Sequence, residues 1–326
     1  MEYFVMSDIH IDFFFFLDLW KDNKEWGYIA TAKKLGNEKT SKIYENCIPS
    51  FQKYYDLYMA PAENLIFAGD CANDYYSQIN FYKFLGTIYD NTYIVYGNHD
   101  LGITSTFGNG NPFKYTEDKC NAIKEMFKND EHVHILDGDV LNNIGGTMGM
   151  CDFHYTTNYD LGIQFKIKEW QKKWYDGKVW HIKTPEWHSG YKINPIAILE
   201  NEKSKLNKII EQQPKIIMTH FCPMELGTQR EYENSSSTAF FYFEAKSFLD
   251  KLDHETWWFC GHIHTFGQCD YVNANGHTIH ICARPQGYPG ENPYVEGAFE
   301  TIYDETSHKY CGRSNVYTLN NRKFKL

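Results

Sequence analysis

The stretch YIVYGNHD, residues 93–100, runs from four apolar residues straight into a glycine, an amide, an imidazole and a carboxylate. An apolar run of this length is typical of a buried strand. Gly-Asn pairs are common in turns, so this stretch alone would be explained by a turn after a strand. The same change from apolar to polar residues recurs along the chain, and the series of such changes decides the fold.

Five apolar or β-branched runs end in side chains that bind metals in proteins: residues 3–7, 64–68, 92–96, 215–219 and 256–260. Ligands in open α/β sheets bind outside the carboxyl ends of the strands, so these side chains should converge. In an extended chain, residues i and i+2 face the same side, and two of the runs are followed by such pairs. The candidate ligands, in chain order, are Asp8, His10, Asp70, Asn98, His220, His262 and His264.

Further elements follow from hydrophobic spacing. Strand-like runs are predicted at 132–136, 147–151, 277–282 and 299–303, and helices at 41–59, 76–90, 116–128, 197–213 and 240–252. The alternation of strand and helix predicts an α/β fold with a sheet layer covered by helices. Residues 152–196 and 222–239 break this alternation, and no Pro/Gly/Ser linker separates two cores. We therefore expect one domain over residues 1–326 with insertions at these two places.

Composition limits the classes of function. The chain has 326 residues, of which 17% are aromatic and 42% hydrophobic, as expected for a globular protein. No segment predicts a membrane span, and the start of the chain does not resemble a secretory leader. Nine scattered cysteines without a C-x-x-C pair predict reduced thiols in the cytoplasm. A net charge of −10 disfavours nucleic acid as a partner, whereas a small anionic substrate is compatible with a bound metal.

The candidate ligands are of a kind that suits Mn, Fe, Zn or Co. Seven ligands are too many for one ion but fit two divalent ions that share a carboxylate, as in hydrolytic sites with metals about 3.5–4 Å apart. Taken singly, each ligand candidate could also be a turn cap or a hydrogen-bonded buried polar group, and for Asp8, Asn98 and His220 the two interpretations are equally good. The tryptophans at 170, 174, 180 and 187 could stack on a base or pack a small core. Arg230 and Arg284 are the candidates for phosphate binding.

The series D-x-H, G-D, G-N-H-D, H and G-H-x-H between Asp8 and His264 resembles the calcineurin-like metallophosphoesterase superfamily. A later segment, RPQGYPGE at 284–291, is similar to the N-P-R-G-Y segment of some bacterial members. The resemblance implies a four-layer α/β/β/α sandwich with mixed β-sheets, here with a helical and aromatic insertion. It also implies two metal sites: Asp8, His10 and His264 at the first, Asp70 bridging, and Asn98, His220 and His262 at the second.

By the same resemblance His99 is the general acid, and Asp100 is the candidate to orient its ring. The chain departs from the G-D-x-V-D-R-G motif of the protein Ser/Thr phosphatases. Asn73 stands where those enzymes have the Asp that supports the catalytic His, and the arginine is absent. A phosphoprotein phosphatase is therefore disfavoured, and Asp100 or Asp74 is expected to support His99 instead.

The sequence thus predicts a metal-dependent hydrolase of a small phosphomonoester or phosphodiester, with a nucleotide-like substrate as one candidate. A hydroxide between the two metals would attack phosphorus, and His99 would protonate the leaving oxygen. Two alternatives stay open: a nuclease of the same superfamily, and a non-catalytic metal-binding interaction scaffold. The sequence does not predict the oligomeric state.

Overall fold

A computed structural model describes residues 1–13, 37–103, 112–155, 162–183, 193–226 and 235–288, together with three short strands nearer the C-terminus. For residues 37–47 and for those three strands, apart from Phe324, only the backbone is described. No helix within these ranges is long and apolar enough to cross a bilayer.

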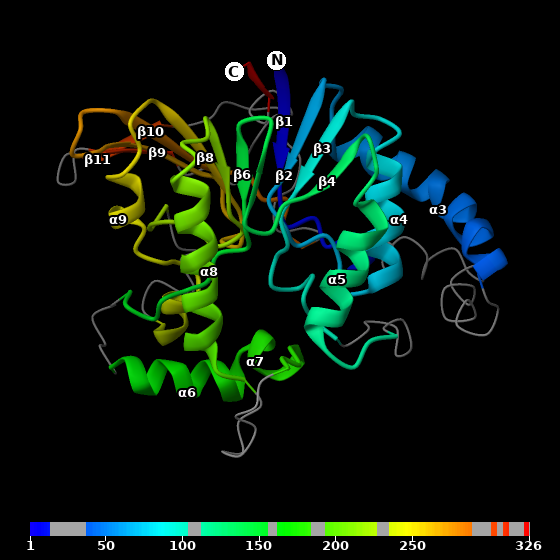
Figure 1. Cartoon of the computed structure of the whole chain (residues 1–326), viewed down its shortest axis with the longest axis horizontal. Coiled ribbons are helices and arrows are strands. Elements are labelled where there is room, and N and C mark those ends of the chain that lie inside the picture. The colour runs from blue at the N-terminus through cyan, green and yellow to red at the C-terminus, as the bar shows by residue number, and fades with distance from the viewer. Residues whose placement is uncertain are drawn as a thin grey trace.

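Two sheets form the centre of the molecule. The first has the order β13 (Lys323–Lys325), β1 (Glu2–Met6), β2 (Asn64–Phe67), β3 (Asn91–Ile94) and β4 (Val133–Ile135). Strands β1 to β4 are parallel, and β13 pairs antiparallel with β1, which places the two ends of the chain side by side (Figure 1).

The second sheet has the order β5 (Asp139–Leu141), β6 (Ile144–Gly146), β7 (Ile216–Met218), β8 (Thr256–Cys260), β10 (Thr278–Ala283) and β9 (Gly267–Val272). Its four middle strands are parallel, and β5 and β9 are antiparallel to their neighbours. A separate two-stranded sheet joins β11 (Thr301–Asp304) to β12 (Lys309–Gly312).

Helices cover the outer faces of both sheets (Figure 1). On the side of the first sheet lie α3 (Asn37–Tyr58), α4 (Tyr75–Leu85) and α5 (Thr116–Phe127), and on the side of the second lie α8 (Pro195–Ile210) and the short α9 (Lys246–Leu249). Helices α6 (Ile163–Lys173) and α7 (Tyr175–Val179) lie at the end of the sandwich opposite the two termini. They come from the predicted insertion at 152–196, and the 3₁₀ helix η3 (Ser236–Phe240) contacts α6.

Successive side chains of a strand point to opposite faces of its sheet, and this alternation separates the core under the helices from the core between the two sheets. In β1, Phe4 and Met6 belong to the core beneath the helices, whereas Tyr3 and Val5 belong to the core between the two sheets. The inner core also contains Phe259 from β8, so it joins one sheet to the other. Strands buried on both faces are apolar throughout, which is why they appear as continuous hydrophobic runs in the sequence. The predicted α/β/β/α sandwich is confirmed.

Two predicted elements are wrong. Residues 147–151 form no strand; the strands lie earlier, at β5 and β6. Strand β6 contains Gly145 and Gly146, and glycine has a low propensity for strands, so the sequence did not predict a strand there. A Cβ at Gly146 would lie 2.7 Å from Val95 Cγ1 of the first sheet, so close packing of the sheets requires glycine there. The helix predicted at 240–252 is only the four-residue α9, preceded by η3.

Candidate metal centre

The candidate ligands stand on loops that leave the carboxyl ends of the strands. Five of the seven have a left-handed backbone with positive φ: Asp8 (53°), His10 (42°), Asp70 (59°), His262 (69°) and His264 (48°). Residues with a side chain rarely adopt this conformation. Such strained residues gather at functional sites, where the surrounding structure holds them in place.

Glycines let these loops approach one another. A Cβ at Gly97 would lie 2.7 Å from Asp70 Cγ and closer still to the Oδ1 of the same carboxylate. A Cβ at Gly261 would lie 2.7 Å from Ser7 Cβ and would also overlap the carboxylate of Asp8. The glycines before Asn98 and His262 are therefore needed because a ligand carboxylate from another strand occupies the space of a side chain.

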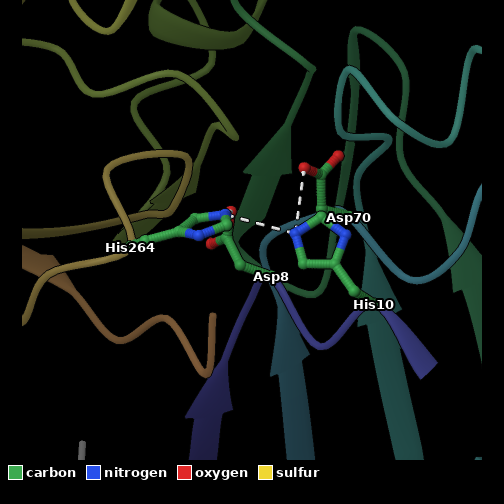
Figure 2. Close-up of side chains that lie close together, drawn as sticks. All are labelled: Asp8, His10, Asp70 and His264. Atoms are coloured by element: carbon green, nitrogen blue, oxygen red, sulfur yellow. Dashed lines mark hydrogen bonds and ion pairs between the residues drawn. The ribbon is translucent and has the colours of Figure 1, made fainter. Parts of the chain in front are cut away.

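One ligand cluster contains Asp8, His10, Asp70 and His264, with one ligand atom of each within 4.8 Å of all the others (Figure 2). The Nε2 atoms of His10 and His264 are 3.2 Å apart. His10 Nε2 lies 3.8 Å from Asp70 Oδ2, and His264 Nε2 lies 3.4 Å from Asp8 Oδ1. These four side chains come from three loops and point toward a common centre.

A second cluster contains Asp70, His220 and His262 by the same criterion, so Asp70 belongs to both. His220 Nε2 lies 3.4 Å from Asp70 Oδ2 and 2.8 Å from Asn98 Oδ1. The other ring nitrogen, Nδ1, lies 2.8 Å from the carbonyl oxygen of Ala68, which fixes the proton on Nδ1 and turns the Nε2 lone pair toward the cluster.

The polar atoms of the clusters fit divalent cations. Within the part of the chain that the structure describes, Asp70 Oδ2 is buried without a hydrogen-bond partner. A buried carboxylate oxygen without a donor is costly unless a cation lies against it. Oxygen and imidazole nitrogen donors suit divalent transition metals. Two cations that share Asp70 are therefore compatible with this donor set.

Charge is concentrated at the shared carboxylate. Burial opposes the charged form of His220, but the carboxylates of Asp70 and Asp8 outweigh burial and raise the pKa of His220 to about 9. Burial and the charge of His220 lower the pKa of His262 to about 3. An imidazole must be neutral to bind a metal, so cation binding at Asp70 would release the proton of His220.

His99 lies beside the clusters. Its Nδ1 is 2.9 Å from Asn73 Oδ1, its ring stacks on Tyr175 at 4.4 Å, and its Nε2 is 3.3 Å from the hydroxyl of Tyr288. Tyr175 also donates a hydrogen bond to Asn73 Oδ1. Burial lowers the pKa of His99 below its ordinary value.

The partner of the His99 ring is thus Asn73, which differs from the prediction that Asp100 or Asp74 orients it. The Asp100 carboxylate instead accepts hydrogen bonds from the backbone N–H groups of Gly97, Asp70 and two further residues, Cys71 and Ala72. It therefore ties two ligand loops together. Asp74 caps helix α4 by accepting from Ser77 N at 2.8 Å.

A pocket of about 280 Å³ opens over both clusters. Its floor includes Asp70, Asn98, His99 and two further residues, His262 and His264. Four aromatic side chains form much of its wall: Trp174, Tyr175, Phe241 and Tyr288. The ring of Tyr288 also stacks on His10 at 4.2 Å.

Comparison with known proteins agrees with this geometry. The family described as calcineurin-like phosphoesterase matches residues 1–266. The chain belongs to this family. As a calcineurin-like phosphoesterase it is a metallophosphoesterase that hydrolyses phosphate esters with divalent metals. No curated protein matches the chain.

Among solved structures, this phosphoesterase is similar to the phosphopantetheinyl hydrolase (PptH) of Mycobacterium tuberculosis. The two chains are 15% identical and align with a TM-score of 0.56 over 88% of this chain and 89% of the other. At this identity, the similarity shows a common fold.

The two arginines predicted to bind phosphate are placed differently. Arg284 of the phosphoesterase is buried, and its guanidinium donates to the carbonyl oxygens of Gly267 and Ala283 and to the side chain of Gln268. It holds β9 to β10 and does not line the pocket described above. Arg230 lies outside the described residues.

The sequence left open whether the tryptophans of the insertion reach the site of the phosphoesterase, and it did not single out Tyr175. Trp174 and Tyr175 line the pocket, whereas Trp170 and Trp180 are fully buried core residues, and Trp187 lies outside the described residues. Residues 152–196 have no clean hydrophobic period, so spacing gave no signal for them. Tyr288, by contrast, is the tyrosine of the RPQGYPGE segment, and that similarity could have located it.

Proposed function

We propose that this phosphoesterase hydrolyses a small phosphate ester at a centre of two divalent cations beneath the aromatic pocket. One observation carries the proposal: Asp70 belongs to two clusters of metal-type ligands, and both clusters contribute to the floor of a single pocket. We further propose that residues 1–326 form one domain, because β13 near the C-terminus pairs with β1 at the N-terminus.

The ligands divide between two cations. Asp8, His10 and His264 would hold the first and Asp70 would bridge; the ligands of the second would be Asn98, His220 and His262. When bound, the cations would polarise the phosphoryl oxygens and make water a nucleophile at neutral pH. The identity of the pair, among Mn, Fe, Zn and Co, follows from metal analysis of the purified protein.

His99 is the proposed general acid. Its Nδ1–H donates to Asn73 Oδ1, so Nε2 is the atom turned to the pocket, and the imidazolium form can donate the Nε2 proton to the leaving oxygen. Tyr288 lies 3.3 Å from this Nε2. We expect the leaving group to lie next to this hydroxyl, on the side of His99 that carries Nε2.

Pocket size and lining support a small substrate with an apolar or planar leaving group. A volume of about 280 Å³ accommodates a phosphate and part of a small organic group, and the four aromatic rings provide flat apolar surface. The neighbouring structure is that of a phosphopantetheinyl hydrolase, which makes a phosphopantetheine-type ester one candidate beside nucleotide-like esters. The net charge of −10 speaks against a nuclease.

Turnover by the Mn²⁺-loaded protein tests the proposal. It should hydrolyse an aryl phosphate, a bis-aryl phosphodiester, or both, and the ratio of their rates would separate monoesterase from diesterase. Asp70→Asn and His99→Ala should lose at least about 10²-fold in kcat. His132→Ala removes an exposed imidazole and should retain wild-type turnover.

Equal activity of wild type and the Asp70 and His99 variants would refute the catalytic assignment. A protein that binds cations but hydrolyses none of these esters would instead be the non-catalytic metal-binding scaffold left open by the sequence.

A further inference from the structure

A short helix of the insertion contacts the loop that carries Asn98 and His99. Asn98 Nδ2 donates to Asp176 Oδ1 at 2.7 Å, and Trp180 Nε1 donates to the carbonyl oxygen of Asn98 at 2.8 Å. Tyr175 stacks on His99 and donates to Asn73. We call these three residues of the insertion, Tyr175, Asp176 and Trp180, the α7 clamp.

Asp176 decides which end of the Asn98 side chain faces the ligands. An amide has a donor nitrogen and an acceptor oxygen, and a carboxylate oxygen can only pair with the nitrogen. Because Nδ2 is bound to Asp176, Oδ1 is turned to His220 Nε2 at 2.8 Å. Asp176 is fully buried, so water does not compete for this hydrogen bond. An amide binds a metal through its oxygen, and this is the end that Asp176 leaves available.

Tyr175 acts on His99 in two ways, through Asn73 and through its own ring. The Asn73 carbonyl oxygen has two lone pairs, and it faces both the Tyr175 hydroxyl and His99 Nδ1. The Asp12 carboxylate accepts from Asn73 Nδ2 at 3.2 Å and so turns the Asn73 oxygen toward His99, and the Tyr175 hydroxyl donates to that same oxygen. The stacked rings, 4.4 Å apart at 13°, prevent the imidazole from turning about its own bond.

The α7 clamp is itself held firmly. Trp180 and Trp170 are fully buried and pack edge to face at 5.6 Å. Gly177 lies against helix α6 so closely that a Cβ there would be 2.8 Å from Gln171 Cα. The carbonyl oxygen of Val179 accepts from Ile103 N at 3.1 Å. These contacts tie α7 both to the insertion and to the chain just after the Asn98 loop.

We propose that the α7 clamp is a positioning element of the metal centre: Asp176 fixes Asn98 as an oxygen ligand of one cation, and Tyr175 holds the His99 ring by stacking on it and by binding the Asn73 oxygen that His99 also binds. The inference rests on the proposed function and deepens it, since it makes the insertion part of the active site. Residues that hold ligands in this way contribute about 10–100-fold to metal affinity or activity.

Isothermal titration calorimetry, in which Mn²⁺ is added to the metal-free protein, tests the role of Asp176. Asp176→Asn keeps the shape of the side chain but can offer either a donor or an acceptor to Asn98. We expect it to weaken one of two binding events by about 10–100-fold and to leave the other unchanged, because Asn98 is proposed as a ligand of one cation only. Lys178→Gln, an exposed change on the same helix, is the matched control and should leave both events unchanged.

Tyr175→Phe tests the other half of the clamp. It removes the hydroxyl that binds Asn73 and keeps the ring that stacks on His99. We expect a fall of about tenfold in kcat on an aryl phosphate, with KM and both Mn²⁺ affinities unchanged, because only the orientation of the general acid is affected. A role in folding alone would lower the melting temperature and leave kcat per folded molecule intact.

The outcomes separate this inference from the proposed function. Wild type that binds fewer than two cations overturns both. Suppose that wild type binds two cations. If Asp176→Asn then binds both with wild-type affinity, or loses the same affinity for both, the role of the clamp is refuted and the proposed function is not. If Asp176→Asn does not fold, Asp176→Ala, which removes the acceptor for Asn98 Nδ2 altogether, carries the same expectations.

Discussion

Gly97→Ala tests whether the ligand loops must approach as closely as the structure shows. Gly97 has no positive φ, so the strain of an alanine would come from contact alone. The added Cβ would lie 2.7 Å from Asp70 Cγ, and ordinary carbon–carbon contact is about 3.5–4.0 Å. Asp70 and residue 97 would therefore have to separate by about 1 Å.

That displacement is large for a shared ligand. Metal–ligand distances tolerate deviations of about 0.2 Å, and a misplacement of about 1 Å can lower a rate about 10²-fold. We expect Gly97→Ala to lose about 10²-fold or more in kcat and to bind both cations more weakly, because Asp70 belongs to both clusters. Overpacking should also lower the free energy of unfolding by about 1–3 kcal/mol.

The assay combines aryl phosphate turnover, Mn²⁺ titration and urea unfolding of the same preparations. Gly102→Ala is the milder control from the same loop, since its Cβ would meet the His99 carbonyl oxygen and the Tyr175 hydroxyl at 3.3 Å, and a shift of a few tenths of an ångström would relieve these contacts. It should keep nearly wild-type turnover. A Gly97→Ala protein that binds two cations and turns over within threefold of Gly102→Ala would show that Asp70 is not fixed by this contact, and the account of the loops would fail.

Three further predictions concern pH, stability and metal removal. Asn73→Asp places a carboxylate beside His99 Nδ1; because an opposite charge favours the imidazolium, the pKa of His99 should rise by about one unit and turnover should persist to higher pH. A pH–rate profile that falls at the same pH as wild type would contradict this. Glu202→Leu removes the buried partner of Thr147, Gly149 N and Lys205, so the free energy of unfolding measured in urea should fall by about 3 kcal/mol. The control Glu200→Ala changes an exposed side chain and should alter this free energy by under about 0.5 kcal/mol. Chelation should abolish turnover and lower the melting temperature, and Mn²⁺ at about 100 times its Kd should restore about 2.7 kcal/mol of stability by mass action; equal scanning-calorimetry traces with and without metal would argue against a metal centre.

The sequence predicted the sandwich and its ligand loops because their signals are local. Each parallel strand is an apolar run followed within a few residues by its ligand, and parallel strands deliver their carboxyl ends to one edge. Gly69, Gly97 and Gly261 stand next to the ligands, so the turn and the ligand can be read together. The strands predicted at 64–68 and 256–260 differ from β2 and β8 by one residue at most.

The contacts that complete the site could not be predicted because they join residues far apart in sequence. Tyr175 reaches Asn73 across 102 positions, and Asp176 reaches Asn98 across 78. No periodic pattern encodes such a contact. Asp100 follows His99 directly and was therefore the natural candidate to orient it, yet its carboxylate lies among the backbone N–H groups of the Asp70 loop. Proximity in sequence was misleading there because adjacent side chains leave the loop in different directions.

The ligand carboxylates also explain how five strained residues are kept in place. A non-glycine residue with positive φ costs about 1–3 kcal/mol, which the surroundings must offset. Asp8 accepts from His262 N at 2.9 Å, and Asp70 Oδ1 accepts from His99 N at 2.8 Å. The backbone of Asp8 in turn donates to Gly69 O at 2.8 Å. The loops that carry His262 and Asn98 are thus each bound by a ligand carboxylate of another loop, through atoms of the protein alone. Arriving cations would meet loops that already hold one another, and binding should therefore raise the melting temperature without changing the far-ultraviolet circular dichroism.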